Sequence, residues 1–556
     1  MKAIISKLLQ KHTPLNEKEI LNLIEVPKSF ELGDYAFPCF ALSKKLQKNP
    51  NQIAEDLKQK IKLPNEIEKI EVSGAYLNFF VNQKIFTKKI INEILKEKDN
   101  FGKNNIGKGK KVIVEFSSPN IAKPFGIGHL RSTIIGNSLA NIYEARGFDV
   151  IKMNYFGDWG TQFGKLILGY KKFGDETKLK KDPIKHLLEI YVKISGDEKY
   201  DEESRKWFKK LEEGDKGALN LWNKFKKLSL KDFEKIYKIL GVTFDIYDGE
   251  SNYNKEVKKV LKELQNKKIL ERSEGALVVD LKKYNLGVCL IQKSDGAALY
   301  TTRDIASAIS RHKKYKFVKM IYEVGQEQKL HFNQVFKILE LMGYEWAKDC
   351  VHTYHGLYLD EDGRKFATRK GKTIFMEDIL NETKRLSSSG IKVRLPKITK
   401  KDLEERSVKV AKAAIFYGDL KNNRTNDIVF DLKRFVSFEG DTGPYLLYSY
   451  ARANSIIKKA KTKNKKSISK LEPAEIKLTK KLSQFPDAVL SAYKTYNPSL
   501  IANYSYGLAQ IFNEFYHACS VINSDNESLR LNLVKSFKIV LKNSLNLLGI
   551  ETLEEM

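Results

Sequence analysis

Cysteine is scarce in this sequence. The chain of 556 residues has four, Cys39, Cys289, Cys350 and Cys519, and none of them forms a Cys-x-x-Cys pair with another. This spacing argues against a zinc ribbon and offers no framework of disulfide bonds. We therefore expect no structural zinc and no resident metal centre.

Long apolar runs are also missing. No stretch approaches the roughly 20 apolar residues that a membrane-spanning helix needs, although 42% of the residues are hydrophobic and suffice for large cores. The N-terminal stretch MKAIISKLLQKH is amphipathic and lacks the apolar core and the small-residue cleavage site of a signal peptide. We expect a cytoplasmic protein without a membrane partner.

Acidic residues are outnumbered by basic ones. The chain has 99 Lys and Arg against 69 Asp and Glu, which gives a formal net charge of +30. Such an excess favours a polyanionic partner, and nucleic acid is the usual one. An AT-rich genome that favours lysine would produce part of the same excess, so the charge alone leaves both explanations open.

The residues with the most chemical character lie between two predicted strands. The β-branched run at 112–114 predicts a buried strand, and a second strand is predicted at 150–155. Between them, the loop EFSSPNIAKPFGIGHLRST (115–133) leads into apolar residues at helical spacing that end at Gly147. Strand, loop, helix and strand in this order predict a right-handed parallel crossover.

The loop of such a unit lies where parallel sheets bind ligands. Free N–H groups and the helix dipole attract phosphate, and Lys123, His129 and Arg131 add side-chain donors. A plain strand-to-helix connection with solvated basic residues is the alternative, which the crowding of prolines, glycines and polar donors disfavours. Gly126-x-Gly128 lacks the third glycine of a dinucleotide fingerprint, so another kind of nucleotide site is indicated.

The stretch EFSSPNIAKPF-x-x-GHLRST resembles the signature region of the class I arginyl-tRNA synthetases. It contains their form of the His-x-Gly-His nucleotide motif, with Gly126 in place of the first histidine. Later motifs in the same order extend the resemblance over nearly the whole chain. The resemblance implies an enzyme that uses ATP with Mg²⁺ to activate L-arginine, transfers it to the 3′ end of tRNA(Arg), and acts as a monomer.

The resemblance also implies a multidomain α/β plus α fold. The expected parts are an N-terminal α+β domain over 1–105 that contacts the tRNA elbow, a Rossmann-like nucleotide-binding catalytic domain over 106–345, a connecting region with a second signature loop over 346–404, and an all-α anticodon-binding bundle over 405–556. A charged stretch at about 165–275 is expected to be a helical insertion in the catalytic domain. Chain length alone predicts about three or four domains.

A strand with an aromatic face is predicted at 73–81 in the N-terminal domain. Exposed aromatic rings beside lysines stack on unpaired bases, and the resemblance favours a tRNA-binding role for Asn78 and Phe79. The residues alone are equally compatible with burial of Phe79 and Phe80 in the domain core.

The nucleotide-binding positions follow from the motifs that match the family. Gly-Asp-Trp-Gly at 157–160 suits a tight turn beside a ligand, and His355 opens the second nucleotide element. The resemblance implies that ATP is bound by Gly126, Gly128, His129, Gly157, Asp158 and His355.

The stretch DGRKFATRKGKT (362–373) resembles the family's degenerate Lys-Met-Ser-Lys-Ser loop. Cations on a closing loop neutralise charge that develops on a polyphosphate in the transition state. The alternative is a solvated basic hairpin, which would have a similar sequence. The resemblance implies that catalysis depends on Lys123, His129, Arg369 and Lys370.

Tyr300 and Asp304 are predicted near the carboxyl end of a strand over 287–302, where α/β sheets bind ligands. A carboxylate there binds a guanidinium in bidentate geometry, although a helix-terminal charge is a common alternative for Asp304. His331 receives no chemical role. The resemblance implies that arginine is held by Glu115, Asn120, Tyr300, Asp304 and Gln328.

From about residue 405 the pattern is helical. Tyr445 and Tyr448 follow a turn-rich loop, and the resemblance of this region to an anticodon-binding domain implies that they contact tRNA. Half-buried helix aromatics are the alternative.

Gly126 leaves a second function open, a synthetase-like tRNA-binding protein that has lost activation. A class I synthetase for another amino acid is a third possibility, which Tyr300 and Asp304 disfavour. We expect an active enzyme, because Lys123 and the cations of 362–373 supply charge and because glycine lets the Gly126 N–H approach phosphate.

Overall fold

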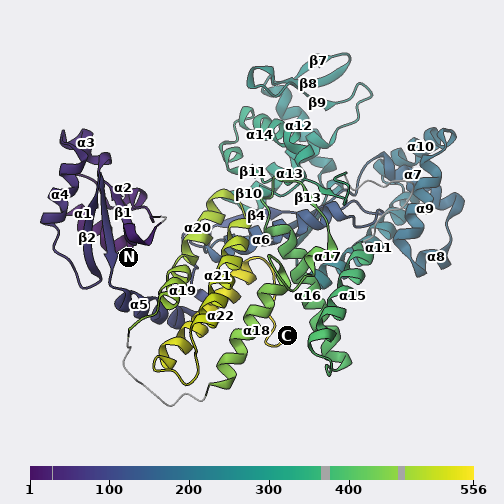
Figure 1. Cartoon of the computed structure of the whole chain (residues 1–556). Helices are drawn as coiled ribbons and strands as arrows, with labels where there is room; N and C mark the ends of the chain where they lie inside the picture. The colour runs from purple at the N-terminus through teal and green to yellow at the C-terminus, as the bar shows by residue number, and fades with distance from the viewer. Residues whose placement is uncertain (28, 365–375, 461–469) are drawn as a thin grey trace. The chain divides into compact units, whose positions relative to one another are not determined.

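The computed structural model describes residues 1–27, 29–364, 376–460 and 470–556, which form two compact units (Figure 1). The first unit consists of Met1–Lys98, Lys459–Ser483 and Ile511–Phe537. The second consists of Asp99–Lys458, Gln484–Gln510 and Lys538–Met556. The predicted nucleotide site therefore belongs to the second unit.

The first unit begins with a small α+β domain whose three-stranded antiparallel sheet has the order β1–β3–β2. The strand predicted at 73–81 is present as β3, but it begins at Tyr76, because Ser73 ends β2 and the chain turns at Gly74, whose φ is +59°. The elements are α1 (Lys2–Gln10), α2 (Glu17–Leu23), β1 (Tyr35–Pro38), α3 (Phe40–Leu46), α4 (Pro50–Lys60), β2 (Ile67–Ser73), β3 (Tyr76–Val81) and α5 (Gln83–Glu97).

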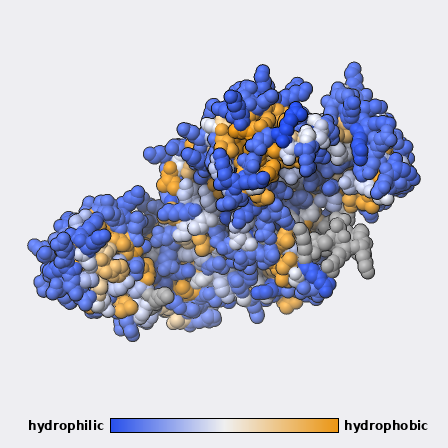
Figure 2. Space-filling view, turned by 90° about the horizontal axis from the view of Figure 1, so that it is seen from above, coloured by the Kyte–Doolittle hydropathy of each residue, from blue (hydrophilic) through white to orange (hydrophobic). Residues whose placement is uncertain are grey.

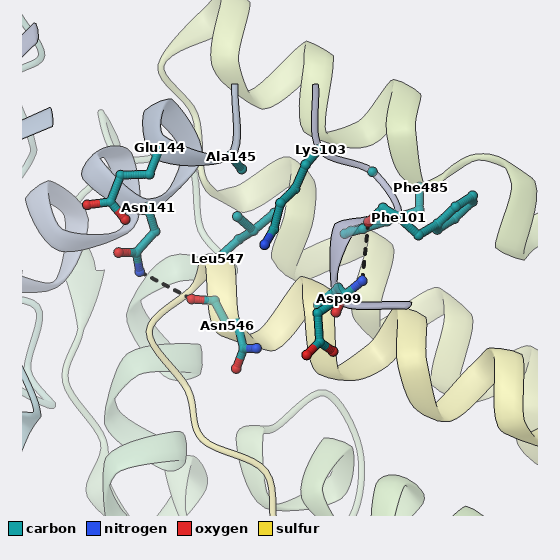
Figure 3. Close-up of a pocket in the computed structure, with 11 residues that line it drawn as sticks. Asp99, Phe101, Lys103, Asn141, Glu144, Ala145, Phe485, Asn546 and Leu547 are labelled. Atoms are coloured by element: carbon teal, nitrogen blue, oxygen red, sulfur yellow. Dashed lines mark hydrogen bonds between the residues drawn. The ribbon is translucent and has the colours of Figure 1, made fainter. Parts of the chain in front are cut away.

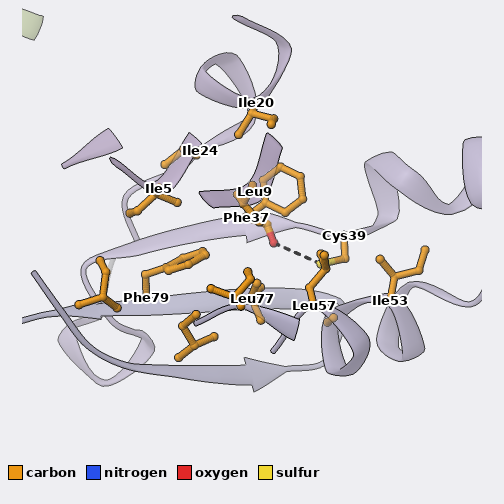
Figure 4. Close-up of a cluster of buried hydrophobic side chains, with 14 of the residues drawn as sticks. Ile5, Leu9, Ile20, Ile24, Phe37, Cys39, Ile53, Leu57, Leu77 and Phe79 are labelled. Carbon is orange, nitrogen blue, oxygen red and sulfur yellow. Dashed lines mark hydrogen bonds between the residues drawn. The ribbon is translucent and has the colours of Figure 1, made fainter. Parts of the chain in front are cut away.

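Apolar side chains of the sheet and of α1, α2 and α4 form the core of this domain (Figure 4). Phe79 of β3 belongs to it and is 0% exposed, and Asn78 is buried as well. Phe80 is half-buried, with Nζ of Lys69 at 4.3 Å from its ring centroid. The expected stacking of Phe79 on a base is not supported, because a ring inside the core has no face free for a base.

A five-stranded parallel sheet organises the second unit, in the order β11–β10–β4–β5–β6. Figure 1 labels three of these neighbouring strands, β11, β10 and β4. Its strands are β4 (Lys111–Glu115), β5 (Asp149–Phe156), β6 (Ile246–Gly249), β10 (Lys319–Tyr322) and β11 (Cys350–His352). Helix α6 (Ile127–Ala145) connects β4 to β5, so the predicted parallel crossover is confirmed. The β-branched residues of β4 are buried, as expected of a parallel strand covered on both faces.

The strand order changes direction beside β4. The chain runs from β4 to β5 and β6 on one side and returns to β10 and β11 on the other. In open parallel sheets, ligands bind at such a switch point, outside the carboxyl ends of the strands. Glu115 ends β4 at this edge, and Glu323 directly follows β10.

Helices fill the stretch after β5. They are α7 (Thr161–Phe173), α8 (Glu176–Lys181), α9 (Pro183–Ser195), α10 (Asp201–Glu212) and α11 (Lys216–Leu240). The predicted helical character is confirmed, but β6 pairs with β5 in the parallel sheet. The sheet thus resumes at Ile246, well before the expected end of the insertion near residue 275.

A separate antiparallel sheet, β7–β8–β9, follows α12 (Asn254–Asn266). Its strands are β7 (Glu271–Ser273), β8 (Ala276–Asp280) and β9 (Val288–Gln292). The strand predicted over 287–302 is present as β9, but its expected extension beyond Gln292 is wrong. After β9 the chain turns at Gly296, whose φ is +84°, and Tyr300 begins helix α13 (Tyr300–Tyr315). Tyr300 and Asp304 therefore lie in the first two turns of a helix and not at a strand end.

The C-terminal part of the chain is helical, as predicted, apart from β13 (Ile428–Val429), which pairs in parallel with β12 (Tyr358–Leu359). The two units divide α21 and α22, so the expected domain limits stay predictions. The helices after β10 are α14 (Lys329–Leu341), α15 (Met376–Arg394), α16 (Lys400–Leu420), α17 (Leu432–Phe435), α18 (Gly443–Lys459), α19 (Pro473–Ser483), α20 (Phe485–Thr495), α21 (Ser499–Ala518) and α22 (Glu527–Leu547).

The surface agrees with the charged composition. The face in Figure 2 is mainly hydrophilic, with apolar residues in separate patches. Within the described residues, no helix has the length and apolarity to cross a membrane.

Phe79→Ala should destabilise the N-terminal domain by about 3–5 kcal/mol, because loss of a buried ring leaves a cavity in a close-packed core. Phe80→Ala, which removes a half-buried ring from the same strand, is the matched control and should cost much less. Hydrogen exchange of β1 and β3 in the full-length protein measures both effects. Equal protection in the two variants would contradict the core position of Phe79.

Candidate active site at the carboxyl edge of the parallel sheet

The loop after β4 crosses the carboxyl edge of the sheet in an unusual conformation. Ser117, Ser118 and Ala122 have φ values of 74°, 45° and 58°, a region that residues other than glycine rarely adopt. The Ser117 N–H donates to Oγ of Ser132 at 3.0 Å, and the Ala122 N–H donates to Oγ of Ser229 at 2.8 Å. These bonds fix the loop between α6 and α11.

His129 faces the amino end of α6 as a neutral side chain. Gly126 caps this helix, and its N–H donates to Nδ1 of His129 at 3.1 Å. Burial, together with nearby His355 and Lys123, lowers the pKa of His129 to about 4. At neutral pH the imidazole thus carries its hydrogen on Nε2 and presents it as a donor.

The Gly126 N–H is already engaged by His129. The expectation that this N–H replaces the missing histidine as a phosphate donor is therefore not supported. A Cβ at Gly126 would meet only Nδ1 of His129, at 3.8 Å, and a Cβ at Gly128 would meet no heavy atom within 4 Å. The helix end is open, and Lys123 lies beside it with Nζ at 5.4 Å from the ring of Tyr191.

His355 lies across the switch point from this helix end. Its Nδ1 is 2.8 Å from Oε1 of Glu323, which is fully buried. Oγ1 of Thr353 donates to the second oxygen of Glu323 at 2.6 Å. Glu323 therefore fixes the orientation of the His355 ring near His129. Arg369 and Lys370, predicted to act from the opposite side, lie outside the described residues.

The turn at 157–160 packs directly on the signature loop. Asn120 forms a parallel bridge with Gly157, where a Cβ would lie 2.0 Å from Oδ1 of Asn120. The Asp158 carboxylate is fully buried and engaged by Nζ of Lys226 at 2.6 Å and by the N–H and Oγ of Ser251 at 2.9 and 2.8 Å. These contacts make the Asp158 carboxylate a structural group, and its contact with ATP stays a prediction.

Carboxylates gather beside the loop. Glu115 is 3% exposed and forms an ion pair with Arg311 of α13. Burial raises the pKa of Glu115 to about 7, with Arg311 opposing and Asp304 adding to the shift. Burial also raises the pKa of Glu250 to about 8, and Asp304 again adds to it. Asp304 therefore lies near both Glu115 and Glu250 and creates a strongly negative environment.

Asp304 has a close partner on the neighbouring helix. Its Oδ2 is 2.6 Å from Nε2 of His331 in α14. Tyr300 is 56% exposed, and its ring centroid is 5.0 Å from that of His331. Gln328 is exposed and immediately precedes α14. The structure thus brings Tyr300 and Asp304 together and adds His331, to which the sequence assigned no role.

Glu250 and Arg311 are functional candidates that the sequence did not reveal. Arg311 is seven residues after Asp304 on α13, a spacing that places both on one helix face. Helical periodicity could therefore have placed Arg311 on the face of Asp304, but it gives no sign that Arg311 is buried. Glu250 follows β6, a strand within the stretch that was predicted to be a helical insertion. No local sequence pattern indicated a role for Glu250.

Tyr445 and Tyr448 lie on α18 and are half-buried. The ring of Tyr445 is 5.7 Å from that of Tyr506. Cζ of Arg452 is 4.9 Å from the ring of Tyr448, and Nη2 donates to the Tyr448 hydroxyl at 3.3 Å. Both rings are partly covered, so contact with RNA and helix packing are both compatible with their positions.

A cavity of about 390 Å³ lies at the opposite end of α6 (Figure 3). Nδ2 of Asn141 donates to the Asn546 carbonyl at 3.2 Å across its wall, and Nδ2 of Asn543 donates to the Phe101 carbonyl at 3.2 Å. None of the predicted site residues lines this cavity. It is separate from the carboxyl edge of the sheet.

Three family models match the chain in succession. The model of the arginyl tRNA synthetase N-terminal domain matches residues 1–81, that of the catalytic domain of class I (R) tRNA synthetases matches 90–432, and that of the DALR anticodon-binding domain matches 446–556. The chain is 49% identical over 561 residues to the arginine–tRNA ligase of Clostridium botulinum (strain Alaska E43 / Type E3), with 99% of each chain covered. It is 46% identical over 564 residues to that of Clostridium acetobutylicum, with 100% of each covered.

Solved structures give the same result. The structure is similar to the Thermus thermophilus arginyl-tRNA synthetase with a TM-score of 0.83 at 26% identity, covering 99% of this chain and 98% of that one. The Plasmodium falciparum arginyl-tRNA synthetase matches with a TM-score of 0.80 at 26% identity, covering 96% and 94%.

Gly157→Ala should weaken ATP binding by tenfold or more, about 1.4 kcal/mol, because its Cβ would displace Asn120 and with it the signature loop. Gly126→Ala is the matched control, since its Cβ has room, and ATP affinity should stay within about threefold. Isothermal titration calorimetry with ATP compares the two. Equal affinities would show that the contact of Gly157 with Asn120 does not position the nucleotide site.

Proposed function

Since the chain belongs to the class I arginyl-tRNA synthetases, we propose that it activates L-arginine with ATP and transfers it to tRNA(Arg) at the carboxyl edge of its parallel sheet. The observation that supports this most directly is that two chemical environments share the carboxyl edge of the parallel sheet. A neutral histidine donor, His129, stands at the open amino end of α6. The carboxylates of Glu115, which ends β4, and Glu250, which follows β6, lie at the same edge, and Asp304 acts on both.

The ATP side of the site is built from donors. We assign the phosphates to His129 Nε2, Lys123 and the open helix end at Gly126 and Gly128, with the turn at Gly157 and the ring of His355 nearby. Helix dipole, ammonium and imidazole N–H all favour negative charge. Arg369 and Lys370 are proposed to add positive charge from the second signature loop.

Mg²⁺ is proposed to enter with ATP and not as a resident ion. Among the described residues, no group of three or more His, Cys, Asp or Glu side chains is arranged to hold a metal ion. Magnesium bound mainly by substrate phosphates and water needs no such group.

The carboxylates suit the two cationic groups of arginine. We propose that Asp304, with Tyr300 and Glu250, receives the guanidinium and that Glu115, Asn120 and Gln328 complete the contacts with the amino acid. A guanidinium offers five donors in a planar fork, which matches carboxylates better than the ammonium of lysine does. Lysine would leave buried carboxylate oxygens unpaired, so it is rejected without an editing site.

The reaction then needs no protein nucleophile. An oxygen of the arginine carboxylate attacks the α-phosphorus of ATP, and the bond from that phosphorus to the bridging oxygen breaks to release pyrophosphate. In the second step a ribose hydroxyl at the 3′ end of tRNA attacks the mixed anhydride, AMP leaves, and the hydroxyl proton is lost. Catalysis consists of positioning and charge stabilisation.

Contact with tRNA is proposed for α18. Tyr448 lies within the matched DALR anticodon-binding region, and Tyr445 directly precedes it; both keep partly accessible rings. The buried positions of Asn78 and Phe79 favour contact of the N-terminal domain with RNA through its surface lysines. A monomeric, cytoplasmic enzyme remains our proposal, and light scattering at micromolar concentration tests the first part.

ATP–pyrophosphate exchange with each proteinogenic amino acid, with and without tRNA, tests the function. We expect exchange with arginine and with no other amino acid. Exchange with another amino acid would favour a different class I synthetase. Tight tRNA binding without any exchange or arginylation would favour the inactive tRNA-binding protein, which none of the matched relatives supports.

Asp304→Ala should lower kcat/KM for arginine by an amount equivalent to about 2–5 kcal/mol, the range for removing one partner of a buried charge pair. Affinity for tRNA should stay close to that of the parent, because the change is confined to the amino-acid site. Glu256→Ala, which removes a partly exposed carboxylate of α12, is the control. An arginine kcat/KM within a few-fold of the parent would refute the assignment of Asp304.

Lys123→Ala should lower kcat for exchange by about 10²- to 10³-fold, because it removes a cation from the developing phosphate charge. Gly126→His should keep activity within a few-fold or raise it, because its Cβ has room and the side chain adds a donor. Steady-state kinetics at saturating ATP compares the two. The opposite order of activities would overturn the assigned phosphate contacts.

A further inference from the structure

Arg311 is a buried arginine that belongs to no recognised motif. Its side chain is 1% exposed, and Cζ lies 4.5 Å from the ring centroid of Tyr155 on β5. The carboxylates of Glu115 on β4 and Asp248 on β6 are its ion-pair partners. Because β5 lies between β4 and β6, a single guanidinium spans three adjacent strands at the carboxyl edge.

The donors of Arg311 are shared unequally. Nε and Nη2 both donate to Oδ2 of Asp248, at 3.3 and 3.0 Å, whereas Nη1 alone donates to Oε2 of Glu115. The Tyr253 hydroxyl and the Asn252 amide also donate to Asp248. Asp248 is thus the anchor that fixes the guanidinium, and Glu115 is held by one donor.

The two carboxylates differ in charge behaviour for the same reason. Burial opposes ionisation of Asp248, but Arg311, Tyr253 and Asn252 outweigh it and hold the pKa of Asp248 below its usual value. Burial raises the pKa of Glu115 to about 7 even with Arg311 present. The charge of Glu115 near neutral pH therefore depends on the guanidinium.

Among the described residues that act on the charge of Glu115, Arg311 is the cation. Asp248 from β6 and Asp304 from α13 add negative charge. Tyr155 from β5 and Tyr322 from β10 stay neutral, because burial raises the pKa of each well above its usual value. Arg311 alone among these groups favours the ionised form of Glu115.

We propose that Arg311 is the positioning residue of the arginine site: anchored on Asp248, it holds the Glu115 carboxylate in place for a cationic group of the substrate. It acts through Glu115 and does not touch the substrate. The proposal rests on the proposed function, in which Glu115 contacts arginine. Asp248 has the supporting role of fixing the Arg311 guanidinium.

The arrangement of Asp248, Arg311 and Glu115 predicts how kcat/KM for arginine changes with pH. Glu115 is ionised above its pKa, so capture of cationic arginine strengthens as the pH rises through about 7. In a plot of kcat/KM for arginine against pH, this rise forms the acid limb. Removing Arg311 takes away the charge that lowers the pKa of Glu115, so the acid limb moves to higher pH. Removing the charge of Asp248 takes away a repulsive neighbour, so the limb moves to lower pH.

The experiment is the pH profile of kcat/KM for arginine in ATP–pyrophosphate exchange with the full chain, saturating ATP and tRNA. For Arg311→Gln we expect the acid limb to rise by one pH unit or more from about 7, which is a loss of about fivefold or more at pH 7 that grows toward about tenfold at acid pH and shrinks at alkaline pH. Arg311→Lys should recover part of the shift, and Asp248→Asn should shift the limb the opposite way. Arg311→Gln combined with Glu115→Gln should show no such limb.

The results distinguish a failure of the Arg311 proposal from a failure of the proposed function. A parent protein that fails to exchange with arginine refutes the proposed function and leaves no profile to shift. An active parent whose Arg311 variants lose kcat/KM equally at every pH, without recovery by lysine, shows that Arg311 is only structural. If Arg311→Gln does not fold, Arg311→Lys and Asp248→Asn carry the test, and shifts of the same sign in both would overturn the proposal.

Discussion

The burial of negative charge at the carboxyl edge of the parallel sheet is the constraint on which the catalytic unit depends. Glu115, Asp248 and Glu323 lie at or beside the carboxyl ends of three of its strands, with exposures between 0% and 7%. A buried carboxylate is tolerated only when it is paired or hydrogen-bonded. Arg311 satisfies the first two, whereas Thr353 and His355 satisfy Glu323. These contacts tie the strand ends to one another at the edge where we propose that the substrates bind.

The helix that presents His129 is fixed by the same principle. Arg131, two residues further along α6, is 1% exposed, donates to the carbonyls of Leu357 and Arg424 at 3.1 and 3.2 Å, and lies 3.5 Å from Asp419 of α16. Through Asp419, Arg131 connects α6 to α16. Through the Leu357 carbonyl, it connects α6 to the start of β12. Breaking one partner of such a pair costs several kcal/mol, because the other charge is left without compensation. The amino end of α6 is therefore held in place by contacts within the protein.

Local sequence patterns predicted the parts of this architecture that local forces decide. The β-branched run of β4 and the helical period of α6 gave the first crossover, since each pattern has one stable solution. The period failed after β9, where Ala297, Ala298 and Leu299 extend an apolar pattern through a turn into α13. Phe79 and Phe80 both have aromatic rings, so alternation alone did not tell which faces the core. Arg311 resembles a solvated helix cation, and its burial is decided by Glu115 and Asp248, which are distant in sequence.

We propose that the guanidinium of the substrate is received beside Asp304 while its activated end faces His129. A crystal structure of the protein with a non-hydrolysable arginyl-adenylate analogue tests it directly. We predict the guanidinium within hydrogen-bond distance of the Asp304 carboxylate, about 2.7–3.0 Å, with the phosphate near Nε2 of His129 at the end of α6. An analogue bound in the reverse orientation, or with its guanidinium away from Asp304 and Glu250, would contradict the account.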